Sequence, residues 1–241
     1  MEIIRVAMWS GPRNISTAMM RSFSARSDSF VVDEPLYAAY LKLTGLNHPM
    51  RDEVLASQST AWQTVVASLL GAIPDGKTLY YQKHMTHHML PQIGREWMAQ
   101  CRNAFLIRNP AAVLASYVVK RSDVTLDDIG IVQQRELFQQ EADRLGKAPP
   151  VIDCEDVLAN PATTLRKLCA QLNIDYTDAM LHWPAGRRST DGVWAPAWYN
   201  AVEQSTGFAP PRSESTSPLP DDLQRIADAA RPHYESMAKF R

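Results

Sequence analysis

The residues best suited to chemistry in this sequence are arginines that stand beside turns and helix starts. The first such segment reads SGPRNIST and follows the short apolar run Ile3–Trp9. A turn between a buried strand and a helix presents backbone N–H groups and the positive end of the helix dipole, and both attract phosphate. We therefore predict an anion-binding loop made of Ser10, Gly11, Pro12, Arg13, Asn14, Ser16 and Thr17.

The same loop departs from the phosphate loop of nucleotide hydrolases. That pattern, G-x-x-x-x-G-K-[S/T], would start at Gly11 and would require glycine, lysine and a hydroxyl residue directly after Ile15. Those positions hold Ser16, Thr17 and Ala18, so the lysine for the terminal phosphates and the hydroxyl ligand of magnesium are missing. A kinase-like or nucleotide-hydrolysing enzyme therefore loses most of its support, although it stays open as an alternative function. A catalytically silent nucleotide-binding module is a further alternative.

A second arginine stands between an expected strand and an expected helix. The segment Ala104–Tyr117 reads AFLIRNPAAVLASY, so Arg108 ends the apolar run and the Asn109–Pro110 pair starts a helix. A guanidinium donates charge-assisted hydrogen bonds that suit a dianionic phosphate. Arg108 is therefore a candidate phosphate ligand, and Ser116 lies eight positions later on the same helix.

The third arginine segment lies late in the chain, from Gly186 to Trp194, and reads GRRSTDGVW. Arg187 and Arg188 supply two adjacent positive charges, and a glycine after them allows a close approach of the backbone to a ligand. We expect this segment to be a loop that closes over a bound anion.

These segments together resemble the nucleotide-binding elements of sulfotransferases that use 3′-phosphoadenosine 5′-phosphosulfate (PAPS). Pro12–Ala18 aligns in register with P-K-S-G-T-T-W, Arg108 and Ser116 with the family's R-N-P-like turn and its serine, and the late loop with R-K-G-x-x-G-D-W. The resemblance covers about residues 5–200 and implies a P-loop-like sulfotransferase fold. The departures are Ile15 for glycine, Ala18 for tryptophan and Ser189 for glycine.

The resemblance implies transfer of a sulfuryl group from PAPS to a hydroxyl or amine of a small-molecule acceptor by in-line displacement. Such a reaction needs cations where charge gathers on the leaving oxygen and a base near the acceptor's proton. Arg13 is the expected leaving-group cation, Thr17 and the loop amides hold the 5′-phosphate, and Lys83 reaches the transferred sulfuryl oxygens. The 3′-phosphate is expected to contact Arg108, Ser116, Arg187 and Arg188. Side-chain cations suffice for a sulfuryl group, so no metal is expected.

Two residues compete for the role of the base, Glu34 and His84. Both follow expected strands, and the carboxyl ends of parallel strands open into the binding crevice. His84 stands in QKHM, which is similar to the family's K-T-H-L-P except that the histidine is one position closer to the lysine. Glu34 stands in VDEPLY, which resembles a carboxylate after the second strand in some bacterial sulfotransferases. We favour Glu34 slightly, and expect Asp33 to serve the turn.

The elements that must position these residues alternate between short strands and longer helices. This alternation predicts an α/β protein with a three-layer α/β/α arrangement and a central, mostly parallel sheet. The expected strands are Ile3–Trp9, Ser29–Val32, Thr78–Gln82, Ala104–Ile107 and Pro150–Asp153. The expected helices are Ser16–Ala25, Leu36–Thr44, Asp52–Leu70, Leu90–Gln100, Ala111–Arg121, Leu126–Leu145, Pro161–Leu172 and Asp221–Lys239. We expect one domain over residues 1–241, with a Pro/Ser-rich tether at about 209–220 before the last helix.

The composition limits the partners of such a domain. The 241 residues are 45% hydrophobic and 21% charged, with a formal net charge of −1, so the chain as a whole attracts neither nucleic acid nor an anionic membrane. Its three cysteines are widely spaced, and no apolar run of about 18 residues exists to span a membrane. We expect a cytoplasmic enzyme that acts on a small molecule, and homodimer formation stays open.

Overall fold

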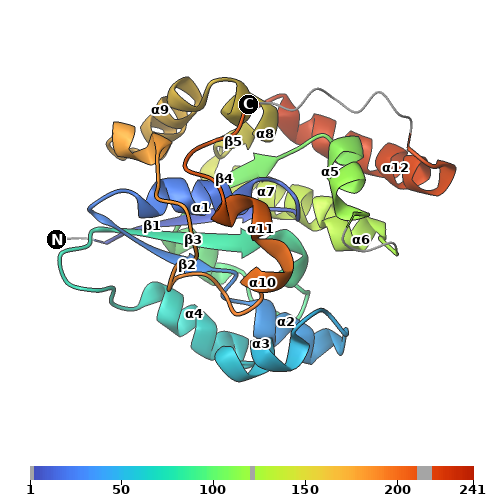
Figure 1. Ribbon diagram of the computed structural model, residues 1–241, viewed down its shortest axis with the longest axis horizontal. Coiled ribbons are helices and arrows are strands. Elements are labelled where there is room, and N and C mark those ends of the chain that lie inside the picture. Colours follow the sequence, from blue (N-terminus) through green and yellow to red (C-terminus); the bar gives the residue numbers. More distant parts are fainter. Residues whose placement is uncertain (1–2, 120–122, 211–218) are drawn as a thin grey trace.

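The computed structural model describes residues 3–119, 123–210 and 219–241 (Figure 1). In that part of the chain five strands form one parallel sheet in the order β2-β3-β1-β4-β5. The strands are β1 (Ile4–Ser10), β2 (Ser29–Asp33), β3 (Leu79–Met85), β4 (Arg102–Ile107) and β5 (Val151–Asp153). The prediction of an α/β fold around a parallel sheet is confirmed.

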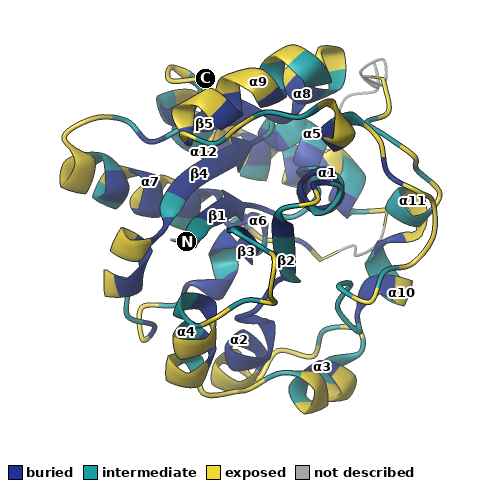
Figure 2. Cartoon of the chain, turned by 90° about the vertical axis from the view of Figure 1, so that its left-hand side faces the viewer, coloured by how far each residue is buried: buried dark blue, intermediate teal, exposed yellow. Residues whose placement is uncertain are grey.

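The sheet is buried on both faces because its central strands are apolar on both. Along β1, Val6 and Met8 belong to one core cluster, while Ala7 and Trp9 belong to the other. All residues of β3 are buried as well. Figure 2 shows the central strands mostly in dark blue, with teal on β2, surrounded by helices whose outer turns are yellow.

Helices cover both faces and complete the three layers. The face of Val6 and Met8 packs against α1 (Ser16–Ser24), α8 (Cys154–Ala159) and α9 (Pro161–Gln171). The face of Ala7 and Trp9 packs against α4 (Trp62–Leu70), α5 (Pro110–Tyr117), α7 (Ile131–Leu145) and α12 (Asp221–Ala238). A third cluster joins α2 (Tyr37–Thr44), α3 (Arg51–Ser57), α10 (Ala195–Trp198) and the start of α11 (Asn200–Glu203).

The prediction of one helix over 52–70 is wrong, because the chain is extended at Gln58 and forms α3 and α4 instead. The Gln58 side chain explains the break. Its Nε2 donates to Glu34 O at 3.2 Å, and its Oε1 accepts from Ala38 N–H at 3.2 Å. The interruption thus lets a side-chain amide support the turn that follows β2.

The prediction of one helix over 126–145 is also wrong, since Gly130 divides it into α6 (Leu126–Ile129) and α7. Gly130 has a φ of 65°, a conformation that glycine adopts without strain. A Cβ there would lie 2.7 Å from Thr86 Oγ1, so any larger residue would collide with the turn after β3.

Three further predicted segments differ from the structure or lie outside its described part. The predicted helix 90–100 is only a short 3-10 turn, η2 (Glu96–Gln100), because Pro91 and Gly94 interrupt the chain before it. The helix predicted to reach Arg121 ends at Tyr117 as α5, and residues 120–122 lie outside the described residues. Most of the predicted tether at 209–220 lies outside them too. Within the described residues, no helix is long and apolar enough to cross a membrane.

Candidate active site

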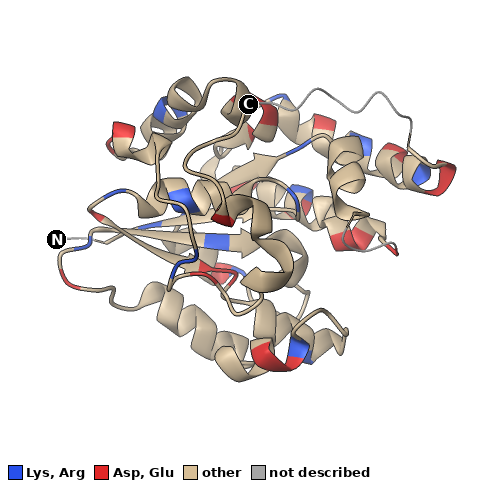
Figure 3. Cartoon of the chain, in the orientation of Figure 1, with Lys and Arg blue, Asp and Glu red and all other residues tan. Residues whose placement is uncertain are grey.

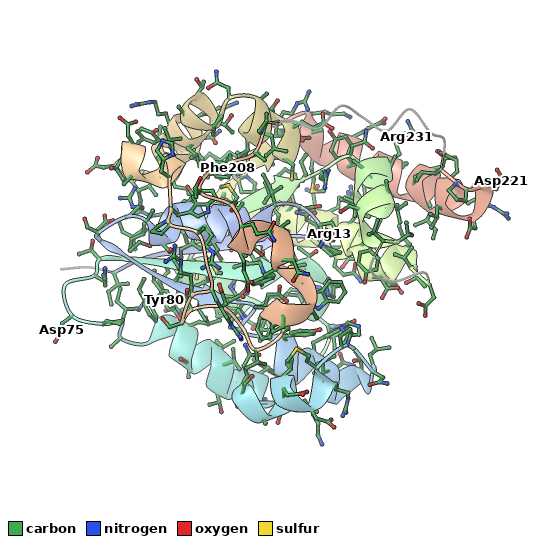
Figure 4. The ribbon with its side chains drawn as sticks, viewed as in Figure 1. Arg13, Asp75, Tyr80, Phe208, Asp221 and Arg231 are labelled. Atoms are coloured by element: carbon green, nitrogen blue, oxygen red, sulfur yellow. The ribbon has the colours of Figure 1, made fainter. Side chains whose placement is uncertain are left out.

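Several predicted site residues lie just after the ends of β1, β2 and β4, which belong to one parallel sheet with β3 between β2 and β1. β2 ends at Asp33, β1 ends at Ser10, and β4 ends directly before Arg108. Because these strands are parallel, their carboxyl ends meet at one edge of the sheet, where ligands bind in open α/β folds. In Figure 4, Arg13 lies toward this edge, whereas Asp75 lies at the opposite end of the molecule.

The loop after β1 is a tight turn that leaves the start of α1 open. Arg13 and Ile15 have φ angles of 61° and 50°, in the left-handed region that costs energy for non-glycine residues. Asn14, between them, is buried and donates from its amide to Leu106 O at 3.3 Å. Ile15 is the N-cap residue of α1, and within the described residues no side chain caps this helix. The first N–H groups of α1 are therefore available to an anion.

The segments of Arg13 and Arg108 meet at this edge. Arg13 Nε donates to Ser116 Oγ at 2.9 Å, and the Arg108 guanidinium donates to Arg13 O at 2.6 Å. Both contacts are partly buried and join residues about a hundred positions apart. The structure thus brings together three of the residues predicted to bind the nucleotide, from the loop after β1, the end of β4 and α5.

The late loop is attached to α1 rather than to the Arg108 turn. Asp191 Oδ2 accepts from Arg188 N–H at 2.8 Å and from the guanidinium of Arg21 at 2.6 Å. Arg21 and Asp191 are 1% and 0% exposed, so this ion pair is fully buried. The Arg188 guanidinium donates to Pro184 O, just before this loop, and Arg187 is exposed. The buried ion pair therefore anchors the loop that carries Arg187 and Arg188 to α1.

Lys83 is the centre of a buried hydrogen-bond network. Its side chain is 1% exposed, and Nζ donates to Asp33 Oδ1 at 2.8 Å, Glu34 Oε1 at 2.7 Å and Tyr199 OH at 2.7 Å. Figure 3 shows a basic band on β3, whose lysine is Lys83. All three ammonium protons have acceptors within the protein. A contact between Lys83 and the transferred group would therefore require one of these bonds to be released.

Glu34 lies directly beyond β2 in a strained backbone conformation, with a φ of 40°. Hydrogen bonds hold its main chain: its N–H donates to Lys83 O at 2.9 Å, and its carbonyl accepts from Tyr37 N–H at 3.1 Å and from Gln58 Nε2 at 3.2 Å. Its side chain is 11% exposed, so the carboxylate is mostly buried. The structure thus places the favoured base candidate against Lys83.

Burial and charge act in opposite directions on this network. Burial raises the pKa of Glu34; the Lys83 ammonium opposes this effect and the Asp33 carboxylate reinforces it. Burial by itself would lower the pKa of Lys83, but the carboxylates of Asp33 and Glu34 outweigh it and raise that pKa well above its ordinary value. The lysine therefore stays protonated, while Glu34 takes up a proton at a higher pH than an exposed glutamate does.

His84, the other base candidate, lies on the opposite face of the sheet from Lys83, because adjacent residues of a strand point to opposite sides. Its ring stacks on Trp9 with centroids 4.4 Å apart, and Trp97 lies 5.3 Å away. Its Nε2 is 3.2 Å from Gln82 Oε1, and burial lowers its pKa to about 3. His84 is thus a neutral core residue in this arrangement.

The remaining histidines near the site pack against aromatic rings. His88 stacks on Tyr37 and lies tilted against Tyr40, with both ring centroids at 4.7 Å. His87 lies against His88 at 4.4 Å. Within the described residues, no group of three or more His, Cys, Asp or Glu side chains is arranged to hold a metal ion.

A family model described as a sulfotransferase domain matches residues 3–241. The chain belongs to the sulfotransferase domain family. Solved structures share its fold, among them a sulfotransferase from Alicyclobacillus acidocaldarius with a TM-score of 0.59 and 12% identity, covering 99% of this chain and 96% of that one. The sulfotransferase domain of the curacin biosynthetic pathway has a TM-score of 0.57 and 17% identity, covering 95% and 98%. A mouse sulfotransferase complexed with PAP has a TM-score of 0.55 and 13% identity, covering 98% and 88%.

Two curated relatives from Arabidopsis thaliana are more similar in sequence. They are named branched-chain-amino-acid aminotransferase-like proteins 1 and 2, and they are 39% identical over 204 residues and 36% identical over 220 residues. These matches cover 85% and 91% of this chain but 36% and 38% of the relatives. The sulfotransferase domain therefore spans little more than a third of the length of the curated relatives it matches.

Several residues that shape the candidate site have contacts that the sequence did not predict. The sequence predicts a turn residue at Asp33, whereas in the structure Asp33 ends β2 and accepts hydrogen bonds from Lys83 and Tyr199. Gln134 of α7 donates to Trp9 O at 3.0 Å and Leu106 O at 2.9 Å, so its amide bridges the ends of β1 and β4. A lone buried amide or tyrosine in a helical segment looks like any other core position. Only its partners show what it does.

Proposed function

We propose that this sulfotransferase domain transfers the sulfuryl group of PAPS to a hydroxyl or amine of a small-molecule acceptor. Membership of the family supports sulfuryl transfer, and one protein of the same fold is complexed with PAP. The observation that carries the donor assignment is the junction of Arg13, Ser116 and Arg108 beside the uncapped N-terminus of α1. This arrangement offers backbone N–H groups for one phosphate and guanidinium groups for a second.

Each phosphate of the nucleotide has its own proposed partners. The backbone N–H groups of Gly11 and of residues 13–17, with the Thr17 hydroxyl, bind the 5′-phosphosulfate. Gly11 suits such a loop because a Cβ there would overlap Ile129 O. The 3′-phosphate is bound by Arg108, Ser116, Arg187 and Arg188.

The proposed reaction is an in-line displacement at sulfur. The acceptor's oxygen or nitrogen forms the new bond to sulfur as the bond from sulfur to the bridging phosphate oxygen breaks, and the leaving bisphosphate keeps that electron pair. Glu34 takes the acceptor's proton, and Arg13 stabilises the charge that grows on the bridging oxygen. The contacts of Lys83 favour a role in positioning the base. Its ammonium holds the Glu34 carboxylate, and the Asp33 carboxylate balances the positive charge of the ammonium.

Thermal unfolding with added nucleotides tests the donor assignment. We expect adenosine 3′,5′-bisphosphate to raise the melting temperature, because a ligand at a hundred times its Kd adds about 2.7 kcal/mol to the free energy of unfolding. ATP with magnesium should have little effect, because the loop lacks the lysine and hydroxyl of the hydrolase pattern. Stabilisation by ATP with magnesium alone would contradict the proposal and favour the kinase-like alternative.

Replacement of Arg108 tests whether this residue binds the 3′-phosphate. We expect Arg108→Ala to weaken binding of adenosine 3′,5′-bisphosphate by about 1.5 to 3 kcal/mol, the loss of a charge-assisted hydrogen bond. Binding of adenosine 5′-phosphosulfate, which lacks the 3′-phosphate, should barely change. Calorimetry of both nucleotides with both proteins measures the difference. An equal loss for the two would show that Arg108 acts by holding Arg13 O in place instead.

A further inference from the structure

Tyr199 reaches the reaction centre from a part of the chain that sequence patterns did not connect with catalysis. It stands between α10 and α11, after the arginine-bearing loop, and is buried. Its hydroxyl accepts from Lys83 Nζ at 2.7 Å and from Trp194 Nε1 at 3.1 Å, and donates to Asp33 Oδ2 at 2.7 Å. A phenol has one proton to donate and two lone pairs, so this hydroxyl is fully used.

The same hydroxyl completes the surroundings of Lys83. An ammonium has three protons, and those of Lys83 go to one oxygen each of Asp33, Glu34 and Tyr199. With only two acceptors, the buried ammonium would have a proton unpaired or would turn away from Glu34 to regain a third partner. The direction of the Lys83–Glu34 bond therefore depends on Tyr199.

A second contact ties this part of the chain to the strands. Gly192 N–H donates to Asp33 Oδ2 at 3.1 Å, on the oxygen that also accepts from Tyr199. Asp33 is thus held by Lys83 on one oxygen and by residues 192 and 199 on the other. The segment that carries Arg187 and Arg188 is in this way joined to the carboxylate pair at the end of β2.

We propose that Tyr199 is a positioning residue, whose hydroxyl holds the Lys83 ammonium against Glu34 and so prepares Glu34 to accept the acceptor's proton. The inference rests on the proposed function for the role of Glu34, whereas the network itself stands on the contacts above. The groups that face Glu34 are Asp33 beside it, Lys83 of β3 and Tyr199; His88, after β3, faces Lys83.

Tyr199→Phe isolates the hydroxyl. The ring stays, and with it the contact of Lys83 Nζ at 5.0 Å from the ring centroid, so the variant removes one hydrogen-bonding group and little packing. We expect the pKa of Glu34 to rise by about 0.5 to 1, the size of one net hydrogen bond, because the ammonium is held less firmly. A carbon-13 NMR titration of glutamate carboxyls measures this directly, with Glu34→Gln assigning the signal. This readout needs neither donor nor acceptor.

In steady-state kinetics we expect the kcat of Tyr199→Phe to be roughly fivefold to tenfold lower than that of the wild type, with the donor's KM unchanged. The acid limb of its pH profile should lie at higher pH. Tyr37→Phe is the matched control, because Tyr37 lies in the same buried cluster and its hydroxyl bonds His48 Nδ1 at 2.9 Å instead. The control should lose a similar amount of stability and leave the Glu34 pKa unchanged.

The outcomes separate this inference from the proposed function. An unchanged Glu34 pKa in Tyr199→Phe, or an equal change in Tyr37→Phe, overturns the positioning role whatever the nucleotide experiments show. A raised Glu34 pKa confined to Tyr199→Phe supports it. Failure of adenosine 3′,5′-bisphosphate to stabilise the wild-type protein overturns the donor assignment while leaving the titration result intact.

Discussion

We expect Glu34→Gln to lower the turnover of the sulfotransferase domain by about 10² to 10⁴, the range for the loss of a general base. Glutamine keeps the shape of the side chain and can still accept the Lys83 hydrogen bond at its carbonyl oxygen, but it takes no proton. Nucleotide affinity should stay unchanged, since Glu34 is expected to contact the acceptor. Steady-state rates with an acceptor found by screening, and the calorimetric Kd of adenosine 3′,5′-bisphosphate, measure the two effects separately.

The pH profile gives the same prediction a second readout. A base works only when it is ionised, so kcat/KM of the wild-type protein should fall as the pH drops through the pKa of Glu34. Burial raises that pKa above the ordinary value of 4.5, so the acid limb should lie above it. This limb should be absent from the residual activity of Glu34→Gln.

His84→Asn is the comparison that decides between the two candidates. We expect it to cost less than roughly tenfold in rate, well under the range for a general base. The physical reason is its position, because the ring packs against Trp9 and Trp97 on the face away from Lys83. If His84→Asn loses far more activity than Glu34→Gln, the histidine is the base and Glu34 binds substrate or supports the fold.

Arg13→Ala should reduce turnover by roughly 10² to 10³, the usual effect of removing one group that stabilises transition-state charge. Nucleotide affinity should fall by less than about tenfold, because the charge that Arg13 stabilises grows on the bridging oxygen only during the reaction. The backbone strain at φ 61° is similar for alanine and arginine, so the comparison reports mainly on the side chain. Parallel kcat and Kd measurements on the variant and the wild type test this.

Arg13→Lys is its matched control. It keeps the positive charge but loses the directed bond to Ser116, so it should retain much more activity than the alanine variant. Near-normal turnover in Arg13→Ala would show that Arg13 only shapes the loop. An equal loss in kcat and in nucleotide affinity would instead assign it to ground-state binding.

The arginine segments could be predicted because each one is contiguous in the chain. Arg13 stands in a turn between an apolar strand and a helix, and Arg108 stands just before an Asn–Pro helix start, where Asn109 does cap α5. Strand, turn and helix in this order place such residues at the carboxyl edge of a parallel sheet. The fold and the arginines near its edge therefore follow from local sequence.

The helix breaks at Gln58 and Gly130 could not be predicted in the same way. Both segments are compatible with a continuous helix by propensity, and a single glycine in a helix costs only about 1 kcal/mol. The decisive interactions are with distant residues, since Gln58 bonds the turn at Glu34 and Gly130 packs against Thr86. Tertiary contacts override a weak local preference at these positions.

Patterns a few residues long were enough to predict the parallel sheet, the loop after β1 as a candidate anion site, and the two candidate bases. Which of the two bases meets a charged partner depends on how the strands pack together. Lys83 and His84 are adjacent in the chain, yet they point to opposite faces of the sheet. Lys83 takes its partners from Asp33, Glu34 and Tyr199, which are 50, 49 and 116 positions away. Contacts over such distances leave no periodic pattern along the chain, so they arise only when the strands and the late segment pack together.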